Sequence, residues 1–236
     1  MAAPLSAGLG GLALHRLELW FATDRNESLL QSEVAQQHLM RVIAGTYRSR
    51  RLRTLRGLAL RPSSDRLREA LFNILGREVE GAVFVDLFAG SGAVGIEALS
   101  RGARRAVFVE KHAAAVKLLR ANLESLGIAI ASSSSKAFAG SAEIMAADAI
   151  AGLERLGARG FKADIVFADP PYADGGGYEG VLDWLGDCEL LAAGGCVILE
   201  HSRRRTLPAV SGQLKRTRVV QQGDATLSFY HVARAA

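Results

Sequence analysis

From residue 82 onward, apolar residues occur in short continuous runs, the pattern of strands buried on both faces of a parallel sheet. The runs are AVFVDLF (82–88), RAVFVE (105–110), AEIMAADA (142–149), ADIVFADPPY (163–172) and GCVILEH (195–201). Amphipathic segments at 93–101, 112–126 and 178–188 predict helices between or after them. Repeated strand–helix units of this kind predict an α/β fold with a doubly wound sheet. Residues 214–232 predict two antiparallel C-terminal strands around QQGD.

The chain before residue 81 has a different pattern. Apolar and basic residues alternate over 41–60, which predicts a small basic β-hairpin that Pro62 ends. Ser63, Ser64 and Asp65 are candidate N-caps of a helix over 66–79. Its apolar face would consist of Leu67, Leu71, Ile74 and Leu75. Arg66 and Arg68 would then point outward.

Three domains are expected: an N-terminal extension of unknown role at 1–39, a basic hairpin and helix at 40–80, and the doubly wound domain at 81–236. Met40 starts the basic segment, so residues 1–39 are either an upstream extension before the natural start or a genuine addition. The serine-rich stretch 129–143 predicts a surface loop inserted before the third strand.

Composition predicts a soluble cytoplasmic protein. Apolar residues make up 49% and charged residues 22% of 236 residues. No apolar run reaches the ~18 residues that a membrane span needs, and the N-terminus lacks the basic region of a secretory signal. Cys188 and Cys196 form no metal-spaced cluster and the five histidines form no ligand pair, so no metal site is expected.

Positive charge is concentrated in one segment. Between Arg41 and Arg68 there are nine arginines, no lysine and one acid, Asp65, whereas the whole chain carries only +5. The planar guanidinium group suits bidentate contacts with phosphate. The segment therefore indicates a nucleic-acid contact rather than a merely solvated face.

The stretch GSGAVG (90–95) matches the G-x-G-x-x-G fingerprint, with Glu110 twenty residues after its first glycine. Asp86 ends the preceding strand, where a carboxylate would repel a pyrophosphate and attract a cationic amino group. This favours S-adenosylmethionine over NAD. Glu110 would accept hydrogen bonds from ribose hydroxyls with either ligand. Asp148 could accept from an adenine amine or cap a helix, and the sequence does not choose.

DPPY (169–172) ends the fourth strand of this pattern. Two prolines cannot continue a ladder, so they fix a rigid turn. If Asp169 and the Pro170 carbonyl accept the hydrogens of an exocyclic base amine, its nitrogen can pyramidalise and direct its lone pair at a methyl donor. Tyr172 would stack on a base withdrawn from its neighbours. The alternative is a simple turn in which the aspartate caps a helix.

These stretches together resemble the bacterial RsmD-type enzymes, which methylate the N2 amine of a guanine in 16S ribosomal RNA with S-adenosylmethionine. The resemblance rests on MRVIAGTYRSRRL, RPSSDRLREALFNIL, VDLFAGSGAVGIEALSRGA, VEK and DPPY, and spans Met40 to the C-terminus. It implies a Rossmann-like class I fold with a mostly parallel seven-stranded sheet. Residues 1–39 and the long serine-rich insertion depart from the family's pattern.

The resemblance also assigns candidate site residues. The cofactor would be held by Asp86, Phe88, Gly90, Ser91, Gly92, Glu110, Lys111 and Asp148. The catalytic cluster would be Asp169, Pro170, Pro171 and Tyr172. RNA would be bound by Arg48, Arg50, Arg51, Arg53, Arg61, Arg66 and Arg68. The expected partner is ribosomal RNA in an assembling small subunit, and a monomer without membrane contact is expected.

Other functions remain open from the residues alone. DPPY suits every exocyclic amine, so a DNA or RNA adenine-N6 or cytosine-N4 methyltransferase is an alternative. An NAD(P)-dependent oxidoreductase is disfavoured by Asp86 and by the lack of an evident hydride-transfer acid or base. A non-catalytic RNA-binding protein is disfavoured by the intact DPPY and glycine loop.

Overall fold

The computed structural model describes residues 40–54, 64–131, 139–171 and 177–232. The extension at 1–39, Arg61, Tyr172 and residues 132–138 of the serine-rich insertion therefore lie outside the described residues. Residues 39–236 form one compact unit, within which the predicted 40–80 and 81–236 regions both fall.

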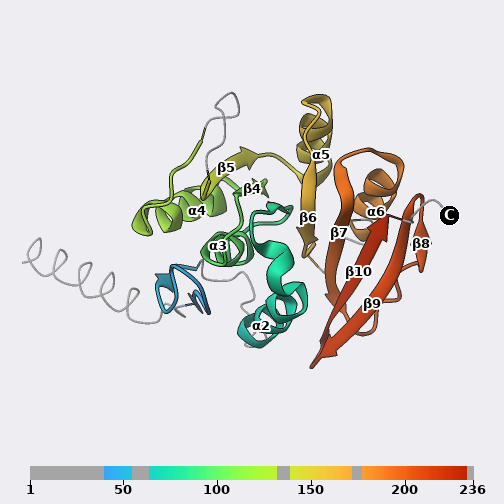
Figure 1. Cartoon of the computed structure of the whole chain (residues 1–236), viewed down its shortest axis with the longest axis horizontal. Helices are drawn as coiled ribbons and strands as arrows, with labels where there is room; N and C mark the ends of the chain where they lie inside the picture. The colour runs from blue at the N-terminus through green and yellow to red at the C-terminus, as the bar shows by residue number, and fades with distance from the viewer. Residues whose placement is uncertain (1–39, 55–63, 132–138, 172–176, 233–236) are drawn as a thin grey trace, which may run out of the picture. The chain divides into compact units, whose positions relative to one another are not determined.

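The main sheet has eight strands in the order β5-β4-β3-β6-β7-β10-β9-β8 (Figure 1). Their bounds are β3 Val83–Asp86, β4 Arg105–Glu110, β5 Ser141–Ala146, β6 Ala163–Ala168, β7 Leu191–Ser202, β8 Val210–Ser211, β9 Leu214–Gln222 and β10 Ala225–Val232. The first five in this order pair in parallel, and β10, β9 and β8 are antiparallel additions. The doubly wound sheet and C-terminal hairpin are thus confirmed, and the two-residue β8 adds an eighth strand to the seven expected.

Helices cover both faces of the sheet, and each face has its own hydrophobic core. Their bounds are α2 Ser64–Leu75, the 3-10 helix η1 Gly76–Val79, α3 Ala93–Ser100, α4 Ala113–Ser125, α5 Ala149–Ala158 and α6 Gly177–Asp187. Side chains of α2, α3 and α4 share one core, and those of α5 and α6 share the other. Helix α5 was not among the predicted helices, although Asp148 was a candidate cap for a helix at this position.

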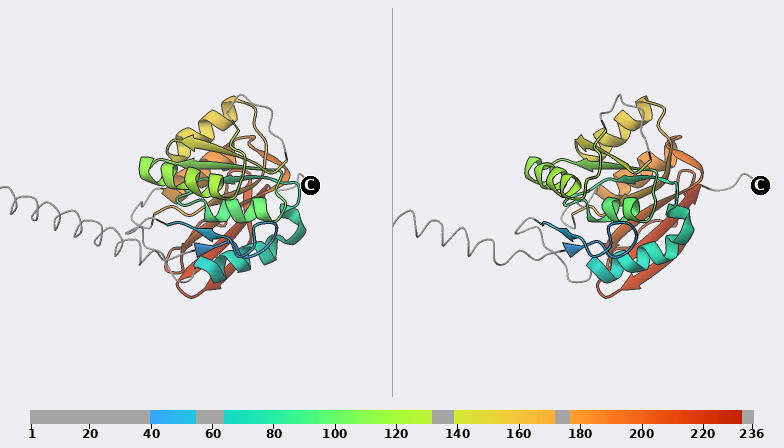
Figure 2. Two further views of the ribbon diagram at one scale, coloured as in Figure 1. Left: turned by 90° about the vertical axis from the view of Figure 1, so that its left-hand side faces the viewer. Right: turned by 60° about the vertical axis from the view of Figure 1, so that its left-hand side comes forward.

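The basic hairpin is shorter than the predicted 41–60. Strands β1 (Met40–Arg41) and β2 (Arg51–Leu52) pair over only two residues each. Val42 and Leu52 are nevertheless fully buried in the core that α2 and α3 share. The hairpin therefore packs onto the same side of the sheet as these helices, as Figure 2 shows.

Helix α3 fixes the backbone of the hairpin loop through Ser100. The Tyr47 amide donates to Ser100 Oγ at 2.9 Å, and this hydroxyl donates to the Ala44 carbonyl at 2.5 Å. Gly45 adopts a φ of +81°, and a Cβ there would lie 1.8 Å from the Ser100 carbonyl oxygen. Only glycine allows the loop to approach α3 this closely.

Glu97 of α3 is a second anchor and is fully buried. Its two carboxylate oxygens accept from the amides of Ile43 at 2.7 Å and Ala44 at 3.0 Å. Arg101 Nε donates to the same carboxylate at 2.7 Å, and Arg68 Nε lies 3.9 Å away. A buried charge is tolerated because it is paired and accepts hydrogen bonds.

The expectation that Arg68 points outward is wrong. Its side chain is 3% exposed and donates to the Arg41 carbonyl at 2.7 Å and to Asp65 at 3.0 Å. Burial lowers the pKa of this guanidinium, while Asp65 and Glu97 oppose that shift. Arg68 thus joins α2 to β1 and α3 from the interior. Helical spacing predicts that position 68 lies beside the apolar stripe of α2. It does not predict that the buried carboxylate of Glu97 lies opposite this position.

Candidate functional site

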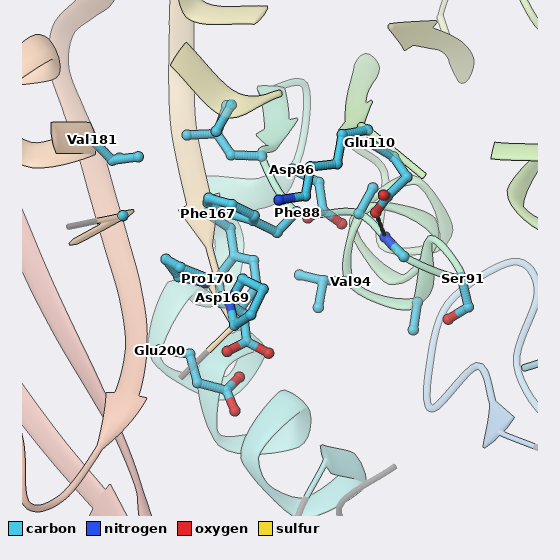
Figure 3. Close-up of a pocket in the computed structure, with 18 of the residues that line it drawn as sticks. Asp86, Phe88, Ser91, Val94, Glu110, Phe167, Asp169, Pro170, Val181 and Glu200 are labelled. Carbon is cyan, nitrogen blue, oxygen red and sulfur yellow. Dashed lines mark hydrogen bonds between the residues drawn. The ribbon is translucent and has the colours of Figure 1, made fainter. Parts of the chain in front are cut away.

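A cleft of about 560 Å³ opens at the carboxyl ends of the central parallel strands. Figure 3 shows carboxylates from three of these strands, Asp86, Glu110 and Asp169, around it. The predicted residues that line it are Arg68, Asp86, Phe88, Gly90, Ser91, Glu110, Lys111, Asp148, Asp169, Pro170 and Pro171. They come together because parallel strands direct their carboxyl ends to one edge of a sheet.

The glycines of the GSGAVG loop have different roles. A Cβ on Gly90 would meet no atom closer than 4.0 Å, so the backbone there is open to a ligand. A Cβ on Gly92 would lie 2.3 Å from Leu119 Cδ1. On Gly95 it would lie 2.3 Å from the Phe108 ring. Gly92 does not line the cleft, contrary to its predicted place in the cofactor site, and it is required for packing.

Asp86 is 2% exposed at the end of β3, and its Oδ2 accepts from the Gly95 amide at 3.1 Å. Burial, with smaller contributions from the negative charges of Asp169 and Glu110, raises its pKa to about 7 against the opposing effect of the Gly95 hydrogen bond. A buried carboxylate with such a pKa is destabilised as an anion. A cationic ligand group beside it would relieve that cost.

Glu110 ends β4 and holds the glycine loop. One of its carboxylate oxygens accepts from the Gly90 amide at 2.9 Å and the other from the His112 amide at 2.7 Å. It is 7% exposed and lines the cleft next to the exposed Lys111. Glu110 therefore has a structural role that the sequence did not predict, and its predicted contact with ribose stays a prediction.

Asp148 caps α5. Its Oδ1 accepts from the Ala151 amide at 3.0 Å, which satisfies a free amide of the first turn. The capping alternative is thus confirmed. The same exposed side chain borders the cleft, so the predicted contact with an adenine amine remains a prediction.

The turn after β6 presents Asp169 to the cleft as an exposed side chain, while Pro170 is buried. The Pro170 carbonyl accepts from the Tyr178 hydroxyl at 3.2 Å, with Tyr178 fully buried in α6. The guanidinium of Arg205 lies 4.5 Å from the centre of the Tyr178 ring. The Tyr178 hydroxyl therefore holds the predicted rigid turn from the protein interior. This contact was not predicted from the sequence.

Asn122 of α4 joins the glycine loop to the basic segment, which the sequence did not predict. Its Nδ2 donates to the carbonyls of Ser91 at 2.9 Å and Arg53 at 3.0 Å. Its Oδ1 accepts from the Arg53 amide at 3.0 Å. The side chain is 1% exposed, so these bonds are shielded from water. One buried amide thus fixes the cleft and the basic surface relative to each other.

The basic segment forms part of the cleft wall. Met40, Thr54, Leu67 and Leu71 line it. The exposed arginines of this segment among the described residues are Arg41, Arg48, Arg50, Arg51, Arg53 and Arg66. The hairpin loop lies at the C-terminal ends of α3 and α4, where Tyr47 is bonded to Ser100 and Arg50 to the Ser125 carbonyl, whereas the glycine loop of the cleft precedes α3.

Two absences concern only residues 40–54, 64–131, 139–171 and 177–232. No group of three His, Cys, Asp or Glu side chains there could hold a metal ion. No helix there is long and apolar enough to cross a membrane. Cys188 and Cys196 are free thiols, and burial raises the pKa of Cys196 to about 12.

Known proteins are similar to this chain in sequence and in fold. The family described as Conserved hypothetical protein 95 matches residues 40–231. Ribosomal RNA small subunit methyltransferase D of Escherichia coli K12 is 35% identical over 191 residues, 81% of this chain and 89% of that protein. The Escherichia coli structure named "Putative methyltransferase yhhF" has a TM-score of 0.69 and 34% identity, over 82% of this chain and 98% of its own.

A more distant structure shares the fold alone. The Thermus thermophilus 16S rRNA N2 G1207 methyltransferase RsmC, solved with AdoMet and guanosine, has a TM-score of 0.58 at 20% identity. The similarity covers 84% of this chain and 50% of that protein.

Proposed function

The chain belongs to the RsmD family of ribosomal RNA small subunit methyltransferases, and on this premise we propose that it methylates the exocyclic N2 amine of a guanine in 16S ribosomal RNA, with S-adenosylmethionine as methyl donor. The observation that carries the proposal is the position of Asp169. It stands at the end of β6 in the same cleft as Asp86, Gly90 and Glu110, beside a wall that belongs to the basic segment.

The residues present fit this cofactor. S-adenosylmethionine supplies a methyl group on a positively charged sulfur and also carries an ammonium group. Asp86 would gain from a cation because its carboxylate is buried and its pKa is raised to about 7. Gly90 leaves its backbone open toward the cleft. Glu110, Lys111 and Asp148 border the same space and offer polar groups for a ribose and a base.

Asp169 and the Pro170 carbonyl would hold the substrate amine. A carboxylate accepts hydrogen bonds without donating any, and a carbonyl oxygen has two lone pairs. Pro170 can therefore accept from Tyr178 and from the amine together. With both hydrogens of the amine engaged, the nitrogen can pyramidalise, so that its lone pair lies out of the plane of the ring and can accept the methyl group. The nitrogen would then lose one hydrogen as a proton, for which the Asp169 carboxylate is the acceptor. This chain would contribute mainly positioning and fixed acceptors to the reaction.

The test is a tritium-transfer assay with labelled S-adenosylmethionine and small-subunit particles from cells that lack the endogenous enzyme. Nuclease digestion and chromatography identify the labelled nucleoside. Label in N2-methylguanosine is the expected result. Label in a methyladenosine would keep the chemistry and overturn the base, and binding of NAD(H) without label would contradict the proposal.

Cofactor binding should depend on pH through Asp86. The raised pKa means that the free protein holds a proton on Asp86 below about pH 7, and a cationic ligand must displace that proton. Affinity should therefore be constant above this pH and fall by up to about tenfold per pH unit below it. Calorimetric titration from pH 5.5 to 8.5 measures this change.

The matched variant is Asp86→Asn, which has no proton to lose. It should bind the cofactor more weakly and show no loss of affinity as the pH falls below 7. Its titration also reveals any pH dependence of the ligand itself. Parallel pH profiles in the two proteins would refute the role of Asp86.

RNA affinity should fall steeply with salt because the exposed arginines would neutralise phosphates. Removing one contact in Arg51→Gln should weaken binding and reduce the slope of log K against log salt by about one. Filter binding between 50 and 300 mM salt measures both. Arg155→Gln, on exposed α5 of the other face, is the control and should retain the slope. A salt-independent affinity would exclude phosphate contacts by the basic segment.

A further inference from the structure

We propose that Glu200 selects the target base by accepting the N1–H of a guanine whose N2 amine is held by Asp169. This inference rests on the proposed function, because it concerns the base chosen by the same cleft. Glu200 lies near the end of β7 and was not among the residues predicted from sequence.

The strand register places the two carboxylates next to each other. Strands β6 and β7 are parallel neighbours in which Ala168 is paired with Leu199. Asp169 comes directly after the last residue of β6 and Glu200 is the next residue of β7, and neighbouring strands lie about 4.8 Å apart. Both side chains line the cleft. Figure 3 shows both carboxylates directed toward the same part of it.

The hydrogen-bonding edges of the bases explain the choice. Guanine presents its N2 amine directly beside N1–H, so two neighbouring groups both donate. Adenine and cytosine present an exocyclic amine beside a ring nitrogen that accepts. Carboxylate oxygens accept hydrogen bonds. They match the two neighbouring donors of guanine, whereas in the other two bases a ring nitrogen that also accepts would face one of these oxygens, and such a mismatch discriminates strongly.

The surroundings of Glu200 suit a flat base. Leu227 of β10 is its direct cross-strand partner and lines the cleft. Leu67 and Leu71 of α2 line the same cleft, and these three leucines are at most 1% exposed, so they form a closed apolar floor. The base would thus lie over this floor, with its Watson–Crick edge toward the carboxylates. The cofactor residues Asp86 and Glu110 belong to the ends of other strands, β3 and β4.

The test compares two bases at the nucleotide that the tritium assay identifies. Small-subunit particles are reconstituted on 16S RNA that carries guanine or 2-aminopurine there. 2-Aminopurine keeps the N2 amine and replaces N1–H with an accepting nitrogen. The wild-type protein should methylate guanine about tenfold faster or more, measured as kcat/KM.

Glu200→Gln should reduce this preference by about tenfold, because its amide can accept from guanine N1–H or donate to N1 of 2-aminopurine. 2-Aminopurine also lacks the O6 atom of guanine, and this affects the wild type and the variant alike. Dividing the guanine preference of the wild type by that of Glu200→Gln therefore cancels the effect of O6. Glu154→Gln, an exposed position on α5, is the matched control and should keep the wild-type preference.

Two results would overturn the role of Glu200. One is an equal preference for guanine in Glu200→Gln and the wild type. The other is equal rates of the wild type on both bases, a result that needs no variant to fold. Failure of the proposed function gives a different result, because the wild type would then not methylate N2 of the guanine at all.

Discussion

Asp169→Ala should lower methyl transfer by about 10²- to 10³-fold, the cost of removing one preorganised hydrogen-bonding group at a reacting centre. The alanine cannot accept a hydrogen from the amine, so the lone pair is no longer directed at the methyl donor. Cofactor affinity should be retained, because Asp169 contacts the substrate in this scheme. Single-turnover rates and cofactor titration separate the two effects.

Asp169→Asn should be milder, because its amide oxygen still accepts one hydrogen bond. Asp187→Ala removes an exposed carboxylate at the C-terminal end of α6 and should leave the rate unchanged. Removing a positioned catalytic group usually lowers the rate by at least about 10²-fold. If Asp169→Ala retained activity within about tenfold of the wild type, the role proposed for Asp169 would be wrong.

Glu97→Ala should destabilise the protein by about 3–5 kcal/mol, the usual cost of removing one partner of a buried ion pair. The amides of Ile43 and Ala44 would lose their acceptor, and Arg68 would keep only Asp65 as an acidic partner. Urea unfolding gives the change in free energy. RNA affinity should fall as well, because the hairpin that carries the exposed arginines loses its anchor.

Glu97→Gln keeps an amide oxygen as an acceptor and loses the charge, so its loss of stability should be smaller. Glu124→Ala on the exposed side of α4 is the control and should change the free energy of unfolding by less than about 0.5 kcal/mol. A stable Glu97→Ala protein with normal RNA binding would show that the hairpin does not depend on this carboxylate.

The sequence predicted the sheet and the cleft well because both follow from local patterns. Continuous apolar runs identified the parallel strands, and an acid at the end of a run marked Asp86 and Glu110 as cleft residues. The DPPY turn located Asp169 in the same way. Parallel strands end at one edge, so these three positions had to converge once the topology was correct.

The sequence could not predict the contacts that join distant segments. Glu97 binds Ile43 across 54 positions, and Asn122 binds Arg53 across 69. No local period reports such pairs, and a polar residue within an apolar helix face gives only a weak signal. The error at Arg68 has the same cause, because its acidic partner Glu97 comes from a helix that the pattern does not place beside it.

The packing of Gly92 and Gly95 affects how the GSGAVG fingerprint should be interpreted across related chains. Both positions exclude a side chain because Leu119 and Phe108 occupy the space, whether or not a ligand is bound. Selection for a stable fold alone would preserve these two glycines in a descendant that had lost its cofactor. At Gly90 the described residues leave room for a side chain, and only the backbone φ of +52° favours glycine. Replacement there by asparagine or aspartate, which tolerate this conformation, would be the sign of such a loss.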